Sequence, residues 1–216
     1  AGAIDDGGVL PDTVINDGGT YKMWYSCNDG AIWRICYATS ADGISWTKYA
    51  SNPVLNLGVA GTWDDAHVYV SGVIKDGSAY KMWYTGHDGT NTRIGYATSP
   101  DGVTWTKYAS NPVVNLGAAG TWDDFHVYNP KVIKIGSAYQ MFYMGYDGAT
   151  WRVGYAGSTN GVTWQKAATN PIINLGGATT WEDVHTYNGA VLLEGNTYKM
   201  WYGGHDGTNL RIGYAT

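Results

Sequence analysis

The chain has 216 residues, of which 44% are hydrophobic and only 14% are charged, and its formal net charge is -5 at pH 7. So many hydrophobic and so few charged residues exclude a disordered chain, and without a basic run or a long apolar stretch neither nucleic acid nor a membrane is expected as a partner. We therefore expect one folded domain, residues 1–216.

A repeat of 59 residues organises the whole chain. The string that begins at Tyr21 with Tyr-Lys-Met-Trp-Tyr returns at Tyr80, Tyr139 and Tyr198 with small changes, each time 59 residues further on. Such self-similarity at a fixed period is typical of repeat architectures. The predicted repeats are residues 1–59, 60–118, 119–177 and 178–216, and the last one ends after about two thirds of the repeat.

Each repeat contains four short runs that predict β-strands, and the second repeat illustrates them. The runs are rich in Val, Tyr and Trp, turn residues separate them, and none has a helical period. In chain order the predicted strands are His67–Lys75, Tyr80–Thr85, Arg93–Ser99 and Val103–Tyr108. The Asp of the turn Ser-x-Asp-Gly-x-(Ser/Thr)-Trp between the last two is expected to cap that turn through local backbone hydrogen bonds.

Four strands per repeat predict an all-β fold, a β-propeller built of four-stranded antiparallel blades. First strands are expected to begin near Leu10, His67, His126 and His185, which gives four blades, the last without its outer strand. A larger ring completed by a second chain, and a piece of a longer protein, are the alternatives. Because an unpaired strand edge can pair with another chain, self-association through the incomplete blade also remains open.

The blade motifs carry a resemblance to a known superfamily. The run Tyr80-Lys-Met-Trp-Tyr-Thr-Gly, the run from Arg93 to Lys107 and Asn111-Pro112-Val113 are similar to the blade repeat of five-bladed propeller glycosidases. That group comprises glycoside hydrolase family 43 arabinanases and β-xylosidases, the fructosidases and the mannoside phosphorylases. The resemblance implies a carbohydrate partner and a glycosidic bond that is cleaved or transferred at a central funnel.

Pairs of acidic residues stand just ahead of the first strands, where the resemblance implies catalytic carboxylates. Glycoside cleavage needs two carboxyl groups, one as proton donor and one as base or nucleophile. Close like charges would raise the pKa of one of them, as a general acid requires. Capping of the loop before each strand is the alternative role. The candidate catalytic residues are Asp5, Asp64, Asp65, Asp123, Asp124, Glu182 and Asp183, with Glu194 as a second candidate for the usual Glu acid.

Aromatic and histidine side chains beside these acids are the candidate substrate-binding residues. A His and a Tyr two residues apart face the same side of a strand. Three such histidines with nearby carboxylates leave open a calcium or other metal ion in the central channel, but their spacing is that of the repeat, so no metal ligand and no cofactor is assigned. The candidates are Trp63, His67, Tyr69, Trp122, His126, Tyr128, Trp181, His185 and Tyr187.

The two cysteines occupy positions at which the other repeats have glycine. Cys27 and Cys36 correspond to Gly86 and Gly95 of the second repeat and flank a hairpin turn. They are therefore expected to be cross-strand neighbours, either joined by a disulfide or present as two small buried thiols. A disulfide would place the protein in an extracellular or periplasmic compartment.

Three classes of function follow from these patterns. The first is a glycoside hydrolase, an inverting one, that acts on oligo- or polysaccharides at the central funnel. The second is a non-catalytic lectin, because near-identical blades suit several equal sugar sites. The third is a duplicated or designed repeat scaffold without a ligand, since stacked repeats fold whatever their function.

Overall fold

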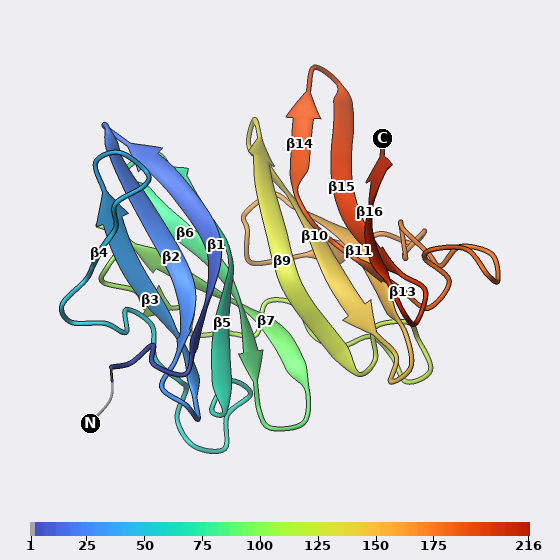
Figure 1. Ribbon diagram of the computed structural model, residues 1–216, viewed down its shortest axis with the longest axis horizontal. Helices are drawn as coiled ribbons and strands as arrows, with labels where there is room; N and C mark the ends of the chain where they lie inside the picture. The colour runs from blue at the N-terminus through green and yellow to red at the C-terminus, as the bar shows by residue number, and fades with distance from the viewer. Residues whose placement is uncertain (1–2) are drawn as a thin grey trace. The chain divides into compact units, whose positions relative to one another are not determined.

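The computed structural model describes residues 3–216, which form sixteen β-strands and no helix (Figure 1). The predicted all-β class is thus confirmed, and this part of the chain has no helix that could cross a membrane. The chain divides into two compact units, Ala1–Pro112 and Val113–Thr216. Each unit contains two antiparallel blades, and we describe each unit by itself.

The first unit holds blades one and two, in which every strand pairs with the next one along the chain. Tight hairpins connect the long strands, and the outermost strand of each blade has only two residues. Blade one consists of β1 (Gly8–Asp17), β2 (Thr20–Asn28), β3 (Trp33–Ser40) and β4 (Thr47–Lys48). Blade two consists of β5 (His67–Asp76), β6 (Ala79–His87), β7 (Thr92–Ser99) and β8 (Thr106–Lys107).

The second unit holds blades three and four. Blade three consists of β9 (His126–Ile135), β10 (Ala138–Tyr146), β11 (Trp151–Ser158) and β12 (Gln165–Lys166). Blade four consists of β13 (His185–Tyr187), β14 (Val191–Glu194), β15 (Thr197–His205) and β16 (Leu210–Ala215). Among the described residues, blade four has no counterpart of the two-residue outer strand.

The first strand of blade four is interrupted, where one continuous strand was expected from His185. β13 and β14 both pair with β15, and residues 188–190 between them leave the ladder. In this gap the side-chain amide of Asn188 donates to the backbone carbonyl oxygens of Asn129 (2.6 Å) and Phe142 (3.0 Å) in blade three. These bonds satisfy two carbonyl groups of the neighbouring blade.

The outer strand is much shorter than the predicted strand Val103–Tyr108. The carboxylate of Asp101 accepts the backbone N–H groups of Thr104 (2.7 Å) and Val103 (2.8 Å), so these residues form a turn instead of a strand. The predicted Asp cap is thereby confirmed, and the same N–H groups lower the pKa of Asp101 to about 2.

An asparagine side chain bonds the backbone of the third strand beside the short outer strand. The side chain of Asn111 accepts the backbone N–H of Tyr96 (2.8 Å) and donates to its carbonyl oxygen (2.9 Å). Asn52 and Asn170 bond Tyr37 and Tyr155 in the same way. In each blade up to the third, one amide side chain therefore satisfies both backbone groups of this tyrosine, and in blades one and three β3 and β11 are bridged again two residues away.

Neighbouring blades within a unit bury a shared apolar core. In the first unit Trp24, with Ile35, Tyr37 and Leu55 of blade one, packs on blade two in one buried cluster. The Trp24 indole N–H donates to the carbonyl oxygen of Gly102 at 2.7 Å. In the second unit Phe142 and Val153 hold the places of Trp24 and Ile35 and pack on Met200 and Tyr202 of blade four. The aromatic residues of the repeat thus serve mainly to join blades.

A tryptophan lies over two glycines inside blade two. A Cβ atom added at Gly86 would lie 2.4 Å from Cζ3 of Trp63, and one added at Gly95 would lie 2.6 Å from Cη2. Trp122 and Trp181 contact the corresponding glycines of blades three and four in the same way. The indole therefore requires glycine at both positions, because any side chain there would collide with the ring.

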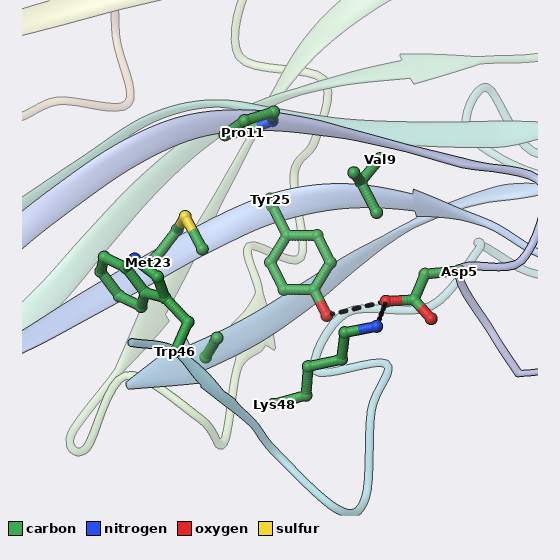
Figure 2. Close-up of a pocket in the computed structure, with 8 residues that line it drawn as sticks. Asp5, Val9, Pro11, Met23, Tyr25, Trp46 and Lys48 are labelled. Atoms are coloured by element: carbon green, nitrogen blue, oxygen red, sulfur yellow. Dashed lines mark hydrogen bonds and ion pairs between the residues drawn. The ribbon is translucent and has the colours of Figure 1, made fainter. Parts of the chain in front are cut away.

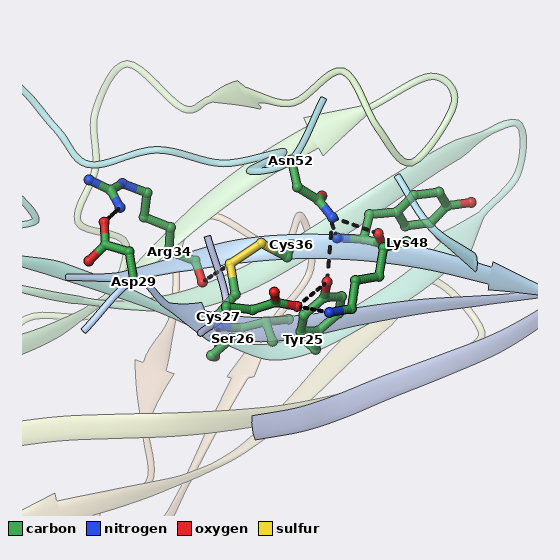
Figure 3. The surroundings of a disulfide bond; sticks show 11 residues. Tyr25, Ser26, Cys27, Asp29, Arg34, Cys36, Lys48 and Asn52 are labelled. Carbon is green, nitrogen blue, oxygen red and sulfur yellow. Dashed lines mark hydrogen bonds and ion pairs between the residues drawn. A yellow bond between two sulfur atoms is a disulfide. The ribbon is translucent and has the colours of Figure 1, made fainter. Parts of the chain in front are cut away.

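Blade one fills the same volume with a disulfide (Figure 3). Ile4 stands where the other repeats have tryptophan, and Cys27 and Cys36, both fully buried, are joined by a disulfide with their Cα atoms 5.9 Å apart. Ile4 packs against this pair. The disulfide, one of the two alternatives that the sequence left open, thus takes the place of the indole.

Candidate functional site

The first acid of each predicted pair lies in a buried cluster at the start of its blade. The Asp64 carboxylate is buried, and its Oδ2 accepts the hydroxyl of Tyr84 (3.0 Å) and the Lys107 ammonium (2.6 Å). Lys107 comes from β8, so the contact joins the innermost and outermost parts of the blade. We call this arrangement the acid–tyrosine–lysine cluster.

The cluster recurs in blades one and three. Asp123 binds Tyr143 (3.1 Å) and Lys166 (2.6 Å), and Asp5 binds Lys48 (2.5 Å) and Tyr25 (3.4 Å). Figure 2 shows Asp5 between Tyr25 and Lys48 at one end of a pocket. The three carboxylates therefore face a lysine of their own blade.

The tyrosines of the acid–tyrosine–lysine cluster stay protonated, so each contributes a neutral hydroxyl group. Burial, reinforced by the negative charge of Asp64, raises the pKa of Tyr84 far above its usual value, and burial next to Asp5 raises the pKa of Tyr25 to about 12. The Tyr84 hydroxyl also accepts the Asn111 amide at 3.3 Å. The network thus connects the acid to the asparagine that bonds the third strand of the blade.

Blade four has a glutamate in this position and a different set of contacts. Glu182 Oε2 accepts the hydroxyl of Tyr202 at 2.6 Å, and no lysine of residues 3–216 is found beside it. Burial and this hydrogen bond raise the pKa of Tyr202 to about 12. Glu194, the second glutamate considered, pairs with Lys199 at the opposite end of β15. The two glutamates therefore do not share a site.

The second acid of each pair caps its own loop. Oδ2 of Asp65 accepts the backbone N–H of Gly61, and Asp124 and Asp183 do the same with the residue four positions earlier, each at 2.6 Å. Asp183 also has a buried Oδ1 atom with no partner among the described residues. These contacts are the ones expected if the second acid caps the loop. A catalytic role for any acid of the pairs stays a prediction.

The predicted substrate-binding tryptophans are largely occupied within their blades. Trp63, Trp122 and Trp181 lie against the paired glycines and against the ring of the cluster tyrosine, at 5.5–5.7 Å between centroids. Their indole faces contribute to packing. Only an exposed edge of each indole is left to contact a sugar, so the role of these tryptophans in sugar binding stays a prediction.

The predicted histidines lie at the start of the innermost strands, and His67 and His185 contact the preceding blade of their unit. Nδ1 of His67 accepts the backbone N–H of Trp33 (3.3 Å), and the ring stacks on His87 with centroids 5.6 Å apart. His185 makes the equivalent contacts with Trp151 (3.2 Å) and His205 (5.8 Å). Tyr69 and Tyr187 lie beside them, as the strand period predicted.

These histidines are expected to make folding stability sensitive to weak acid. Burial, together with the neighbouring His87, lowers the pKa of His67 below its ordinary 6.5, and burial next to His205 does the same for His185. Protonation would occupy the accepting Nδ1 and place a charge against a second imidazole. Because the unfolded chain binds the proton more readily, stability is complete above pH 6.5 and falls as the pH drops below it.

Thermal unfolding between pH 7.5 and 5 measures this effect. The double variant His67→Gln/His185→Gln is expected to show a shallower loss of melting temperature across that range than the parent. The pKa values of Asp29 and Asp88 are lowered to about 2, so these two carboxylates titrate far below that range. Parallel curves for parent and variant would contradict the prediction.

Blade three carries an aromatic stack that the sequence did not predict. The rings of His126, Tyr146 and Trp151 stack with centroids 4.7–5.7 Å apart, Phe125 packs edge-on against His126, and Tyr128 lies 6.0 Å from Trp151. The repeat has His87 and Thr92 at the positions of Tyr146 and Trp151 in blade two. Repeat one also has a tryptophan, Trp33, at the Trp151 position, so the departure that marks this stack in the sequence is Tyr146.

No group of three or more His, Cys, Asp and Glu residues within residues 3–216 is arranged to hold a metal ion. The histidines His67 and His185 each use Nδ1 for a backbone N–H. A metal ion in the central channel therefore stays a prediction without a ligand set.

Two curated relatives cover part of the chain. An uncharacterized protein of Mycobacterium tuberculosis is 32% identical over 141 residues, which are 61% of this chain and 44% of that protein. A β-1,2-mannobiose phosphorylase of a Thermoanaerobacter species is 25% identical over 119 residues, 49% of this chain and 38% of the relative. The chain thus spans less than half the length of these relatives.

A solved structure and a family model match a larger share of this chain than the two relatives do. Zg3597, a family 117 glycoside hydrolase of the marine bacterium Zobellia galactanivorans, superposes with a TM-score of 0.72 over 96% of this chain and 70% of its own, at 18% identity. This likeness confirms the predicted β-propeller fold, and the number of blades stays a prediction. Residues 62–214 match the model of glycoside hydrolase family 130, described as β-1,4-mannooligosaccharide phosphorylase. The chain therefore belongs to glycoside hydrolase family 130, within the propeller glycosidase superfamily that its blade motifs resemble.

Proposed function

We propose that this protein binds mannose-containing oligosaccharides and cleaves a glycosidic bond in them at the central funnel. The observation that carries the proposal is the family match over residues 62–214, whose description names a phosphorylase of β-1,4-mannooligosaccharides. A relative named as a β-1,2-mannobiose phosphorylase supports the same class of sugar. Water or inorganic phosphate would be the acceptor of the released mannosyl group, and the experiment below distinguishes them.

Glu182 is the acid that we propose as the proton donor. Glu182 is the glutamate among the first acids of the pairs, and its Oε2 accepts the Tyr202 hydroxyl at 2.6 Å. A general acid must be able to hold and release a proton near its substrate. Glu182 is only half-buried, so a ligand can reach it.

The aromatic stack of blade three is proposed as the sugar platform. Aromatic rings present flat apolar faces with polar tips, and ligand sites combine such faces with a few polar groups. His126, Tyr146 and Trp151 supply the rings. Repeat one also has a tryptophan, Trp33, at the Trp151 position, but it has Asn28 at the Tyr146 position, so the three-ring stack belongs to blade three. A platform confined to one blade favours a single site over the several equal sites of a lectin.

The test is turnover of β-1,4- and β-1,2-linked manno-oligosaccharides with and without inorganic phosphate, followed by chromatography, beside calorimetric binding. We expect one binding site per chain and shorter products, as mannose in water or mannose 1-phosphate with phosphate. Glu182→Gln should lower turnover about 100-fold or more and leave binding intact, and Glu194→Gln is the control. Intact sugar bound at three or four sites would support the lectin, and no binding would support the bare scaffold.

Sugar affinity is expected to depend on Trp151. Changing Trp151→Thr, which copies the residue of repeat two, should weaken binding about 10-fold by removing one ring of the stack. Leu210→Thr makes the same change at the equivalent position of blade four and should leave affinity unchanged. Equal affinities for both variants and the parent, measured by calorimetry, would place the sugar elsewhere.

We also propose an oxidising compartment, extracellular or periplasmic, for this protein. The support is the buried disulfide between Cys27 and Cys36, a bond that persists in such compartments. The protein is isolated from its native source, unfolded and alkylated without a reductant; two alkyl adducts by mass spectrometry, at Cys27 and Cys36, would contradict the proposal.

A further inference from the structure

Asn129 of blade three has a backbone conformation that its place in the sequence does not favour. Its φ angle is 50°, in the left-handed region that residues other than glycine rarely adopt. Pro130 follows it, and a residue before proline ordinarily adopts an extended backbone. Asparagine tolerates the left-handed region better than most residues, but surrounding contacts must hold it there. Strained backbone of this kind is concentrated at functional sites.

Asn129 has also left the strand ladder of its blade. Its neighbours Tyr128 and Lys131 keep their partners on β10, and between them two residues, Asn129 and Pro130, lie opposite one. Such a β-bulge twists a strand and redirects the side chains beside it. In blade two the equivalent residue, Val70, stays in the ladder and pairs with β6. The repeat therefore does not impose the conformation of Asn129.

The side chain of Asn188, from blade four of the same unit, holds this conformation. Its amide nitrogen donates to the carbonyl oxygen of Asn129 at 2.6 Å, and its oxygen accepts the Asn129 side-chain amide at 2.9 Å. It also donates to the carbonyl oxygen of Phe142 at 3.0 Å. Asn188 is buried and comes from the break between β13 and β14. Asn188 thus fixes both the backbone and the side chain of Asn129.

This pair of asparagines is a departure from the repeat. Asn129 and Asn188 are equivalent to each other and to Pro11 and Val70 of the first two repeats. In the first unit the contact at this place comes from a backbone group, because the N–H of Val70 donates to Ser26 Oγ at 3.1 Å. Blades three and four therefore share a side-chain contact that proline and valine cannot form.

Tyr128, directly before Asn129, connects the bulge to the aromatic stack. Its ring lies 6.0 Å from the Trp151 ring in an edge-on contact within the same blade. The equivalent Tyr69 of blade two lies 5.7 Å from the ring of Trp33, which belongs to the preceding blade. Because the bulge separates Tyr128 from the rest of β9, its geometry sets where this ring lies.

We propose that Asn188 is a positioning residue for the sugar platform of blade three. It holds Asn129 in the left-handed conformation, the bulge places Tyr128 edge-on against Trp151, and Trp151 is thereby kept in its stack. A binding site depends on such support, because its side chains must be held to within about 0.5 Å. This inference rests on the proposed function, which places the sugar on that stack.

Nuclear magnetic resonance of the Trp151 indole N–H tests the positioning without any sugar. Its signal is assigned by its loss in Trp151→Thr. Asn188→Ala removes the amide that holds the bulge, and Asn129→Ala introduces a residue that disfavours the left-handed conformation, so each should shift the signal. Asn129→Gly should leave the signal in place, because glycine adopts this conformation without a partner. Asn196→Ala, on an exposed residue of the turn between β14 and β15, is the control.

The double variant Asn129→Gly/Asn188→Ala is the rescue. It should return the Trp151 signal toward its parent position, which a role of Asn188 in blade packing alone would not predict. If Asn188→Ala does not fold, the comparison of Asn129→Ala with Asn129→Gly decides, because both keep Asn188. An unmoved signal in the alanine variants, or the same shift in Asn129→Gly, would overturn the inference whether or not a sugar binds.

Calorimetric titration with manno-oligosaccharides tests the consequence for binding. Asn188→Ala and Asn129→Ala should bind the sugar about 5-fold more weakly than the parent, and the double variant should recover most of that affinity. Shifted Trp151 signals with unchanged affinity would overturn the role of the pair in the platform. A parent that binds no sugar would refute the proposed function, while the signal shifts would still establish Asn188 as the residue that positions Trp151.

Discussion

Replacing Cys27 and Cys36 together with glycine is expected to lower the free energy of unfolding by about 3 kcal/mol. Most of this loss comes from the unfolded chain, which gains freedom when a loop of about ten residues is opened. The folded protein also loses packing, because Ile4 is too small to fill the space that the two sulfur atoms occupy. Urea unfolding of the oxidised parent and the glycine variant measures the difference.

A third substitution separates packing from crosslinking. In the glycine background, Ile4→Trp reproduces the arrangement of Trp63 over Gly86 and Gly95, so it should recover part of the lost stability. In the parent, the same Ile4→Trp change should be destabilising because the indole meets the disulfide. An equal effect of Ile4→Trp in both backgrounds would show that the two solutions are not interchangeable.

Asp64→Ala is expected to cost about 3 kcal/mol of folding stability, whatever its effect on turnover. The change leaves the Lys107 ammonium and the Tyr84 hydroxyl without their shared acceptor in a largely buried place. Lys107 is partly exposed, which keeps the cost at the lower end of the range for a broken buried pair. Asp65→Ala, which removes one loop hydrogen bond, should cost only about 1 kcal/mol.

A double-mutant cycle identifies the cause. Adding Lys107→Met to Asp64→Ala removes the unpaired charge, so the double variant should be more stable than the sum of the single changes predicts. Urea denaturation midpoints and turnover are measured on the same samples. Additive losses would argue against the cluster, and a loss of turnover with full stability in Asp64→Asn would argue for a catalytic Asp64.

The regular features of the fold could be predicted because they repeat. The 59-residue period, the Val- and Tyr-rich runs and the Asp-Gly turns located every long strand within a few residues. The outer strand was overestimated because Val103 and Thr104 alternate like strand residues, yet Asp101 binds their N–H groups. A side chain that competes for the backbone is invisible to a hydrophobic pattern.

The candidate site was only partly predictable, for a related reason. The acids stand where the sequence placed them, but Lys107 lies 43 residues from Asp64, and the pattern does not reveal that the two meet. Repeat one has Ile4 where repeat two has Trp63, and it has Cys27 and Cys36 in place of glycines. Alignment of the repeats alone could have shown that these changes belong together. Residues that are the same in every repeat form the scaffold. Residues that differ from their counterparts in the other repeats indicate a feature that belongs to one blade.

The amide that bonds the third strand of blades one to three has a consequence for solubility. A sheet edge normally exposes N–H and C=O groups that can recruit a foreign strand and start aggregation. Asn52, Asn111 and Asn170 occupy those groups on a tyrosine of β3, β7 and β11, so a two-residue outer strand is sufficient. Because the asparagine belongs to the repeat, every duplication of a blade copies this protection against misassembly along with the fold.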